Sequence, residues 1–250
     1  MGSRAAFVFL LGLMLLASLC LAAKGFDFYY FILLWPGAYC QATNSGCCRP
    51  TTGKPADDFL IRDLVTFNIT TGSAVTGCEK INFNFTELSS IRSELEAHWA
   101  NIKCPSNDGK SNWRSKWKNY GVCSGLNETE YFKRGLELKA KVDLLSHLSS
   151  KGIYPNYNLY KIRDIKNAIA AGIGTEPLIR CSKGPFGTFQ LFEVHICVAR
   201  DGWTIIDCPV KPKFTCNDEI LFHPYKSWML NDTAKAFSVI PRIEMPISME

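Results

Sequence analysis

The chain has 250 residues, of which 47% are hydrophobic and 20% are charged, and its formal net charge at pH 7 is +5. This is the composition of an ordinary globular protein, long enough for one sizeable domain with a buried core. It excludes a low-complexity chain, and no internal repeat is evident.

The first 23 residues have the three regions of a secretory signal. Arg4 supplies the positive charge, an apolar run covers residues 5–21, and Ala22 and Ala23 are small. A membrane anchor is the alternative, but the run is short for a span of about 20 residues. We therefore expect a signal peptide at residues 1–23, entry into the secretory pathway and no membrane attachment after the signal is removed. Loss of Arg4 leaves a mature net charge of 5 − 1 = +4.

Cysteine content indicates an oxidising compartment. The chain has 11 cysteines, and Cys20 lies in the signal, which leaves 11 − 1 = 10 in the mature protein. An even number favours five disulfides. No paired Cys-x-x-Cys motif indicates zinc, and no phosphate-binding loop, dinucleotide fingerprint or Gly-x-Ser-x-Gly is present. We expect no metal and no cofactor.

Periodicity then predicts the elements along the chain. Residues 26–35 form a continuous apolar and aromatic run that predicts a buried central strand. Residues 88–100 carry apolar side chains at steps of three and four, as an amphipathic helix does. The same spacing predicts three further helices, the last ending at Gly172, over residues 112–120, 128–150 and 159–172.

Towards the C-terminus the period changes to that of strands. Residues 188–200 and 203–208 flank Asp201-Gly202, a pair suited to a tight hairpin turn. Helices followed by strands predict an α+β domain. Residues 222–250 are a C-terminal extension with an apolar end that contains two prolines. We consider it a removable vacuolar sorting propeptide or a frayed terminus.

Four Asn-x-Ser/Thr triplets predict N-linked glycans behind the signal peptide. They begin at Asn68, Asn84, Asn127 and Asn231. Asn68 lies six residues after Arg62.

The segment from Trp113 to Cys123 reads Trp-Arg-Ser-Lys-Trp-Lys-Asn-Tyr-Gly-Val-Cys. It resembles the second active-site box of the plant S-like ribonucleases of the T2 family, Trp-x-His-Glu-Trp-x-Lys-His-Gly-x-Cys. Both tryptophans, the glycine and the cysteine match. The residues in place of the family's histidine, glutamate, lysine and second histidine are Ser115, Lys116, Asn119 and Tyr120.

The first active-site box of the same family is altered in a similar way in this chain. The family's Ile-His-Gly-Leu-Trp-Pro corresponds to Ile-Arg-Asp-Leu-Val-Thr at residues 61–66, so that Arg62 stands in place of a histidine. Leu33 and Leu34 stand in place of base-contacting glutamines. The resemblance covers nearly all of the mature chain and includes residues 26–40, 104–109, 152–155, 196–198 and 207–209.

The resemblance implies a disulfide-rich α+β fold over residues 24–221, in which helices flank a central antiparallel sheet, and residues 222–250 run past the point where many family members end. It places Asn68 in a loop that borders the substrate groove in the related enzymes, so a sugar there is expected to obstruct an RNA strand. It also implies five disulfide pairs. These are Cys40 with Cys47, Cys48 with Cys104, Cys78 with Cys123, Cys181 with Cys216, and Cys197 with Cys208.

In the related enzymes histidines move the protons of RNA cleavage. Arg62 cannot release its proton, Ser115 has no useful pKa, and tyrosine such as Tyr120 ordinarily titrates near pH 10. The four histidines lie outside both boxes and are expected to be structural or solvent-exposed; they are His98, His147, His195 and His223. The sequence therefore predicts no catalytic residue and a protein that is not an enzyme.

Positive charge supports a different use of the site. Four basic residues of the two boxes are candidates for phosphate binding: Arg62, Arg114, Lys116 and Lys118. With Trp113 and Trp117 they fit weak binding of single-stranded RNA by charge and stacking. Alternatively, the tryptophans stand four residues apart because they belong to the core.

Three functional hypotheses follow. The first is an inactive, ribonuclease-like vegetative storage glycoprotein, vacuolar or extracellular, a role taken from inactive storage relatives in the family. The second is a non-cleaving RNA-binding or defence protein. The third is a residual nuclease that uses altered groups.

Overall fold

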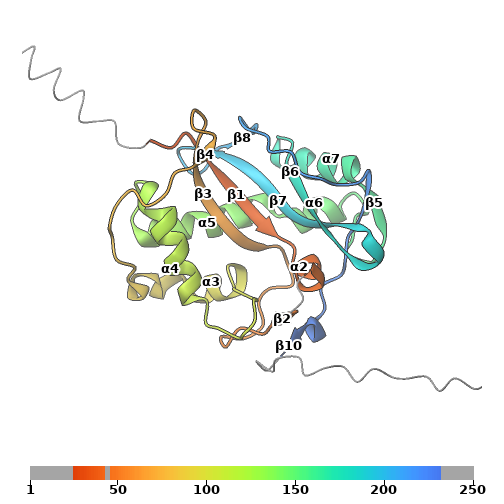
Figure 1. Ribbon diagram of the computed structural model, residues 1–250, viewed down its shortest axis with the longest axis horizontal. Coiled ribbons are helices and arrows are strands. Elements are labelled where there is room, and N and C mark those ends of the chain that lie inside the picture. The colour runs from red at the N-terminus through yellow and green to blue at the C-terminus, as the bar shows by residue number, and fades with distance from the viewer. Residues whose placement is uncertain (1–24, 43–45, 232–250) are drawn as a thin grey trace, which may run out of the picture.

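The computed structural model describes residues 25–42 and 46–231 (Figure 1). The expected signal peptide and the apolar end of the C-terminal extension lie outside these residues. Within them, no helix combines the length and the apolar character that a membrane crossing requires.

A central, mostly antiparallel sheet organises the described chain, as the resemblance implied. Its main path runs β4-β3-β1-β7-β9-β5, and β6 and β8 also pair with β7. A short parallel pair, β10 with β2, lies apart from it. The strands are β1 (Phe28–Leu34), β2 (Cys47–Cys48), β3 (Leu60–Asn68), β4 (Ser73–Ala74), β5 (Leu159–Lys161), β6 (Leu178–Lys183), β7 (Phe189–Ala199), β8 (Ile205–Ile206), β9 (Glu219–Leu221) and β10 (Leu230–Asn231).

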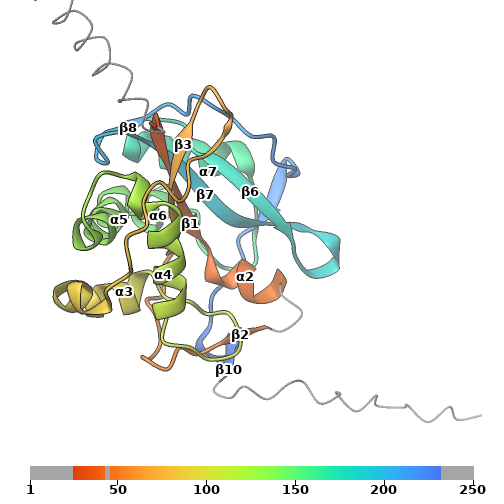
Figure 2. The same ribbon diagram turned by 60° about the vertical axis from the view of Figure 1, so that its left-hand side comes forward.

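Helices α3, α4 and α5 gather on one side of strands β1 and β3 (Figure 2). The helices are α2 (Pro36–Ala42), α3 (Arg92–His98), α4 (Lys110–Asn119), α5 (Glu128–Val142), α6 (Leu144–Ser149) and α7 (Ile162–Ile173). Short 3₁₀ turns are η1 (Phe85–Ile91), η2 (Gly121–Cys123), η3 (Pro185–Gly187) and η4 (Ser227–Met229). The α+β class is therefore confirmed.

Several predicted helix bounds are corrected. The helix predicted over 128–150 breaks at Asp143, whose φ of 26° is not helical. The helix predicted over 159–172 begins only after strand β5 and ends at Gly174, which takes the left-handed conformation with φ 84°. Gly172 instead lies inside α7, where an added Cβ would come within 2.2 Å of the His147 ring. Its lack of a side chain serves helix packing rather than helix termination.

Side chains alternate across β1 between two apolar clusters. Phe31 and Leu33 belong to the main core, which also contains buried side chains from α3, α4 and α5. Phe28 and Tyr30 point to a smaller cluster that includes Cys197 and Cys208. Burial of each large side chain contributes about 1.5–3 kcal/mol. β1 is thus the buried central strand that its continuous apolar run predicts.

All five disulfides form between the cysteines that the resemblance paired. Sequence separations within the pairs range from 7 to 56 residues. The disulfide between Cys48 and Cys104 closes the longest loop and ties strand β2 to the segment before α4.

The packed domain continues past the predicted boundary at residue 221. Phe222 is fully buried, and its ring lies 5.0 Å from that of Trp35. The Trp35 indole N–H donates to the backbone oxygen of His223 at 2.6 Å. At Gly37 an added Cβ would come within 2.7 Å of that same oxygen, so only glycine fits there. Residues 222–231 are therefore part of the folded body, and strand β10 ends it in the described chain.

Candidate phosphate-binding groove

A groove of about 210 Å³ opens where the start of β3, helix α4 and the segment before α4 meet. Arg62 of β3 and Lys116 of α4 both line it. Its lining is completed by Leu34, Tyr39, Leu60, Ile61, Ala100, Asn101, Ile102, Lys103 and Asn112.

Arg62 owes its position to an irregularity in β3. The register between β1 and β3 shifts at Ile32 and Leu33, opposite Arg62. Its neighbours Ile61 and Asp63 are both buried, whereas the Arg62 side chain is 39% exposed. The shift thus turns one long cation out of an otherwise buried strand.

Helix α4 positions Lys116 through its two tryptophans. Trp113 and Trp117 are buried, and the Trp113 indole N–H donates to the backbone oxygen of Trp99 at 2.9 Å. With one face of α4 fixed in the core, Lys116 points towards β3. There its ammonium nitrogen lies 2.6 Å from Asp63 Oδ1.

Asp63 links the two cations. Its second oxygen, Oδ2, lies 3.9 Å from Arg62 Nε. Burial raises the pKa of the Asp63 carboxyl, and this effect outweighs the opposing charges and hydrogen bond of Lys116 and Arg62. The 2.6 Å contact nevertheless places the Lys116 ammonium beside Asp63 at the wall of the groove.

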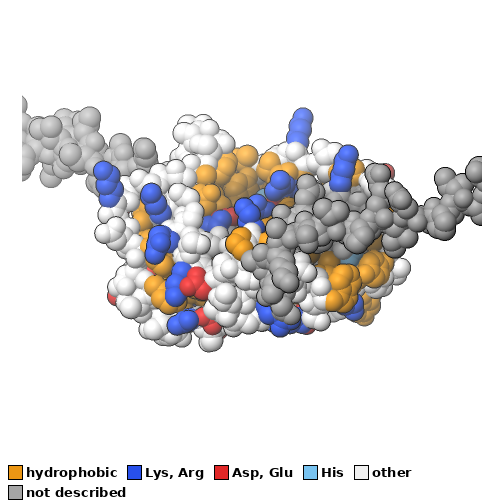
Figure 3. All heavy atoms as spheres, turned by 60° about the horizontal axis from the view of Figure 1, so that its bottom comes forward, with side chains coloured by type: hydrophobic (Ala, Val, Ile, Leu, Met, Phe, Trp, Pro, Cys, Tyr) orange, Lys and Arg blue, Asp and Glu red, His pale blue; other side chains and the backbone are white. Residues whose placement is uncertain are grey.

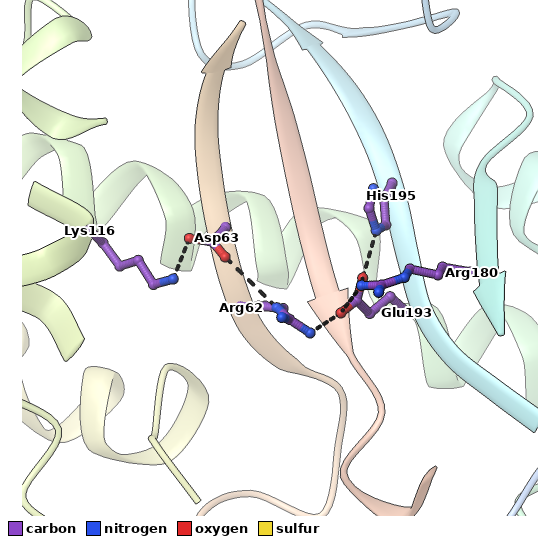
Figure 4. Close-up of polar contacts among 6 residues, drawn as sticks. All are labelled: Arg62, Asp63, Lys116, Arg180, Glu193 and His195. Atoms are coloured by element: carbon purple, nitrogen blue, oxygen red, sulfur yellow. Dashed lines mark hydrogen bonds and ion pairs between the residues drawn. The ribbon is translucent and has the colours of Figure 1, made fainter. Parts of the chain in front are cut away.

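A second carboxylate, Glu193 of β7, is only 1% exposed and gathers three basic groups. Arg62 Nη1 donates to Glu193 Oε1. Arg180 Nη1 of β6 lies 3.2 Å from Oε2, and His195 Nε2 lies 2.9 Å from the same oxygen. Figure 4 shows these groups as a row across the sheet, from Lys116 to Arg180. Burial alone would raise the pKa of Glu193, but its bond with His195 and the arginine charges together lower it.

Acid is expected to weaken the fold through Glu193. Because its pKa in the folded chain lies below the ordinary value of 4.5, its ion pairs stabilise fully above that pH. The contribution is lost as the pH falls through the folded pKa. Thermal unfolding between pH 7 and 3 should show this loss, and Glu193→Gln should lose less over the same range. An equal decline in both proteins would contradict the assignment.

The row of charges suits an anion. Three cations, Arg62, Lys116 and Arg180, face two carboxylates, Asp63 and Glu193, so these five groups together keep one positive charge. Both arginines have N–H groups beyond those used on Glu193, and an arginine fork matches the oxygens of a phosphate. The groove can therefore bind a phosphate without a metal ion, and no cluster suited to a metal occurs in residues 25–42 and 46–231.

Of the four cations proposed from sequence, the structure brings two together, Arg62 and Lys116. Arg114 and Lys118 lie two residues either side of Lys116, so they leave α4 in other directions. Both are exposed, and the Arg114 guanidinium lies 5.8 Å from the Phe83 ring. Neither lies in the groove lining, so their role in phosphate binding stays a prediction.

The other positions of the second box are spread around α4. Ser115 is exposed, and its hydroxyl accepts from the Asn119 amide at 3.4 Å. Tyr120 is half-buried; burial, and then the nearby charge of Asp63, raise the pKa of its hydroxyl. Neither residue is in the groove lining.

The sequence pattern did not single out Glu193 and Arg180, and it assigned His195 only to a hairpin. A signal was present, because Glu193 and His195 share one face of a strand whose other residues are mostly apolar. Buried polar residues on such a face require partners. Which partners they have depends on sheet order, since Arg62 is 131 residues away in sequence.

The remaining histidines stay outside the groove. His223 is buried, its Nδ1 lies 2.7 Å from the Pro224 oxygen, and burial lowers its pKa. Burial also lowers the pKa of His98, which ends α3. His147 packs against α7 at Gly172.

Asn68 does not border the groove. It is the last residue of β3, six residues from Arg62, and a strand of that length spans about 20 Å. Its side-chain amide donates to the Gly25 oxygen at the far end of the sheet. A sugar on Asn68 would therefore lie away from the groove, which corrects the expected obstruction.

Comparisons with known proteins agree with the fold. Residues 26–208 match the model of the Ribonuclease T2 family. Ribonuclease 3 of Arabidopsis thaliana is 40% identical over 203 residues, which are 80% of this chain and 90% of that protein. Extracellular ribonuclease LE of Solanum lycopersicum is 38% identical over 89% of this chain and 99% of its own length. The protein belongs to the Ribonuclease T2 family.

The structural comparison gives the same assignment. The crystal structure of RNase NT in complex with 5′-AMP superposes with a TM-score of 0.76 at 36% identity, over 80% of this chain and 99% of that one. A more distant relative is a ribonuclease-like storage protein of Panax ginseng, 28% identical over 71% of this chain and 73% of its own.

These relatives contradict the prediction that the chain is not an enzyme. Two relatives at 38–40% identity are named ribonucleases, and the superposed structure is a ribonuclease with a bound nucleotide. The prediction depended on five positions in two short boxes, whereas the similarity extends over 80% of the chain or more. That prediction is withdrawn.

Proposed function

We propose that the protein binds single-stranded RNA in the groove, with Arg62 and Lys116 on a phosphate. The observation that carries this proposal is the convergence of Arg62 and Lys116 on Asp63 at the groove wall. RNA cleavage, the activity that the relatives' names state, belongs to the same groove, where these cations would stabilise charge developing on the phosphate.

The surroundings of the groove support a polyanion as the ligand. Basic side chains spread across the side of the molecule that carries α2 and β2, with few acidic side chains between them (Figure 3). Lys103 lies in the groove lining together with Arg62 and Lys116. Such a surface attracts nucleic acid by releasing its counterions, and the affinity falls as salt rises.

Arg62→Gln tests the proposal. We expect a roughly 10- to 100-fold loss of affinity for a short RNA, because a charge-assisted hydrogen bond contributes about 1.5–3 kcal/mol. Affinity is measured at pH 6 with a 2′-O-methyl oligonucleotide, which lacks the ribose hydroxyl needed for cleavage. Cleavage of unmodified RNA is followed in parallel from pH 4 to 8, since an Arg62-dependent product would assign turnover to the groove.

Lys133→Gln is the matched control, because Lys133 is a 60% exposed cation on α5 that pairs with Glu137. It should leave the affinity within about twofold of the native value. Equal losses in the two variants would show unspecific attraction, and unchanged binding by Arg62→Gln would refute the proposed site. Circular dichroism confirms that each variant is folded.

Storage is a second candidate function. The similarity to the ginseng storage protein favours it, and five disulfides suit a stable protein that accumulates. It predicts high abundance in a storage tissue and seasonal loss. A constant trace level in every tissue would argue against storage without affecting the RNA proposal.

A place in the secretory pathway, vacuolar or extracellular, completes the proposed function. It is supported by the disulfides, which persist in oxidising compartments, and by the similarity to an extracellular relative. Intact-mass analysis of the native protein would test the expected cleavage after residue 23, the four glycans and removal of the C-terminal tail.

A further inference from the structure

Arg180 lies beyond the groove but is joined to it through Glu193. Oε1 of Glu193 accepts from Arg62 Nη1 and also lies 3.4 Å from Arg180 Nη1. Two donors on one oxygen stand at most about 6 Å apart. The two arginines therefore present their guanidinium groups side by side on the surface of the sheet.

Arg180 is also fixed and accessible. Its side chain is 45% exposed, and its guanidinium lies 5.6 Å from the centre of the Phe192 ring. Phe192 in turn stacks with Tyr39 at 6.3 Å and 19°. Because Tyr39 lines the groove, an aromatic row leads from the groove to Arg180.

The charges around Arg180 leave it free to bind an anion. Its carboxylate partner, Glu193, is shared with Arg62 and His195. One buried carboxylate thus faces two permanent cations and the His195 ring. A buried carboxylate can orient both arginines while it neutralises only one charge.

We propose that Arg180 is a second phosphate subsite, which binds the RNA phosphate next to the one held by Arg62. Glu193 is the positioning residue for both arginines. Successive phosphates of a strand are separated by one ribose, a distance of the same order as the spacing of the two guanidinium groups. This inference deepens the proposed function and depends on it.

The subsite makes affinity depend on the number of phosphates. Two probes separate the sites: a 2′-O-methyl dinucleotide with one internal phosphodiester and a trinucleotide with two. The native protein should bind the trinucleotide more tightly. Arg180→Gln should lose about tenfold in affinity for the trinucleotide and stay within about twofold for the dinucleotide. For the trinucleotide, the plot of log affinity against log salt has a negative slope, and in Arg180→Gln the magnitude of this slope should decrease by about 0.7.

Two variants control this experiment. Arg180→Lys keeps a cation beside Glu193 but loses the planar fork, so it should regain only part of the trinucleotide affinity. Arg163→Gln removes a 76% exposed arginine on α7 that pairs with Asp164. It should leave the affinity for both probes unchanged.

The outcomes separate the subsite from the groove. If Arg62→Gln weakens both probes and Arg180→Gln weakens neither, the second subsite is refuted and the groove stands. If Arg180→Gln weakens both probes equally, Arg180 acts only through Glu193 and Arg62, and the subsite is again refuted. Native protein that binds neither probe would overturn the proposed function together with the subsite.

Discussion

Replacing Trp117 with alanine is expected to lower the free energy of unfolding by about 3–5 kcal/mol, the usual cost of deleting a large buried aromatic side chain. Trp117 is 2% exposed, and its ring lies 6.0 Å from that of Tyr131. An added Cβ at Gly121 would come within 2.1 Å of the indole. The ring therefore fills the space beside a backbone that approaches too closely for any side chain.

Guanidinium unfolding followed by circular dichroism measures this effect. Trp228→Ala is the matched control, because Trp228 is 68% exposed, and exposed substitutions usually change stability by no more than about 0.5 kcal/mol. A loss below about 1 kcal/mol for Trp117→Ala, together with weaker RNA binding, would mean that Trp117 stacks on a base instead.

The burial of Trp113 and Trp117 decides between the two interpretations of these tryptophans, which were base stacking and core packing. Both indoles lie in the core, so they anchor α4 and offer no stacking platform. The proposed RNA binding then depends on the polar side of the helix, where Lys116 meets Asp63. The matching tryptophans of the box maintain the helix, whatever residues stand at the catalytic positions.

Sequence patterns correctly predicted the strands and turns whose formation depends mainly on residues close together in the sequence. The apolar run at 26–35 became β1, and the segment around Asp201-Gly202 became the turn between β7 and β8. The break at Asp143 was missed because apolar spacing continues through it, whereas α6, which follows the break, packs against α7. Gly172 was misread as a helix end because glycine also serves close packing, here against His147.

The candidate site was only half predictable. Arg62 and Lys116 stand in recognisable boxes, so their charges were visible in the sequence. The contribution of Glu193 was not visible in the sequence, because Glu193 contacts Arg62 only when β1 lies between β3 and β7 in the sheet. Glu193 changes the role of Arg62, from an isolated cation to one of two arginines on a buried carboxylate.

Removing the disulfide between Cys48 and Cys104 is expected to lower the free energy of unfolding by about 4 kcal/mol, the chain-entropy value for its loop of 56 residues. Alanine at both positions avoids unpaired thiols. The same disulfide supports the groove, because Cys48 N–H donates to the backbone oxygen of Ile102 at 3.0 Å and Ile102 lines the groove. We therefore expect RNA affinity to fall several-fold as well.

Cys197 and Cys208 provide the control, since their disulfide closes a loop of 11 residues in the smaller apolar cluster, away from the groove. Its removal should cost about 3 kcal/mol and leave RNA affinity unchanged at a temperature where the variant is folded. Guanidinium unfolding and oligonucleotide titration of both variants separate the two effects. Equal affinity losses would mean that the groove responds to global stability, whereas a loss confined to the Cys48–Cys104 variant would show that this disulfide holds the groove wall in place.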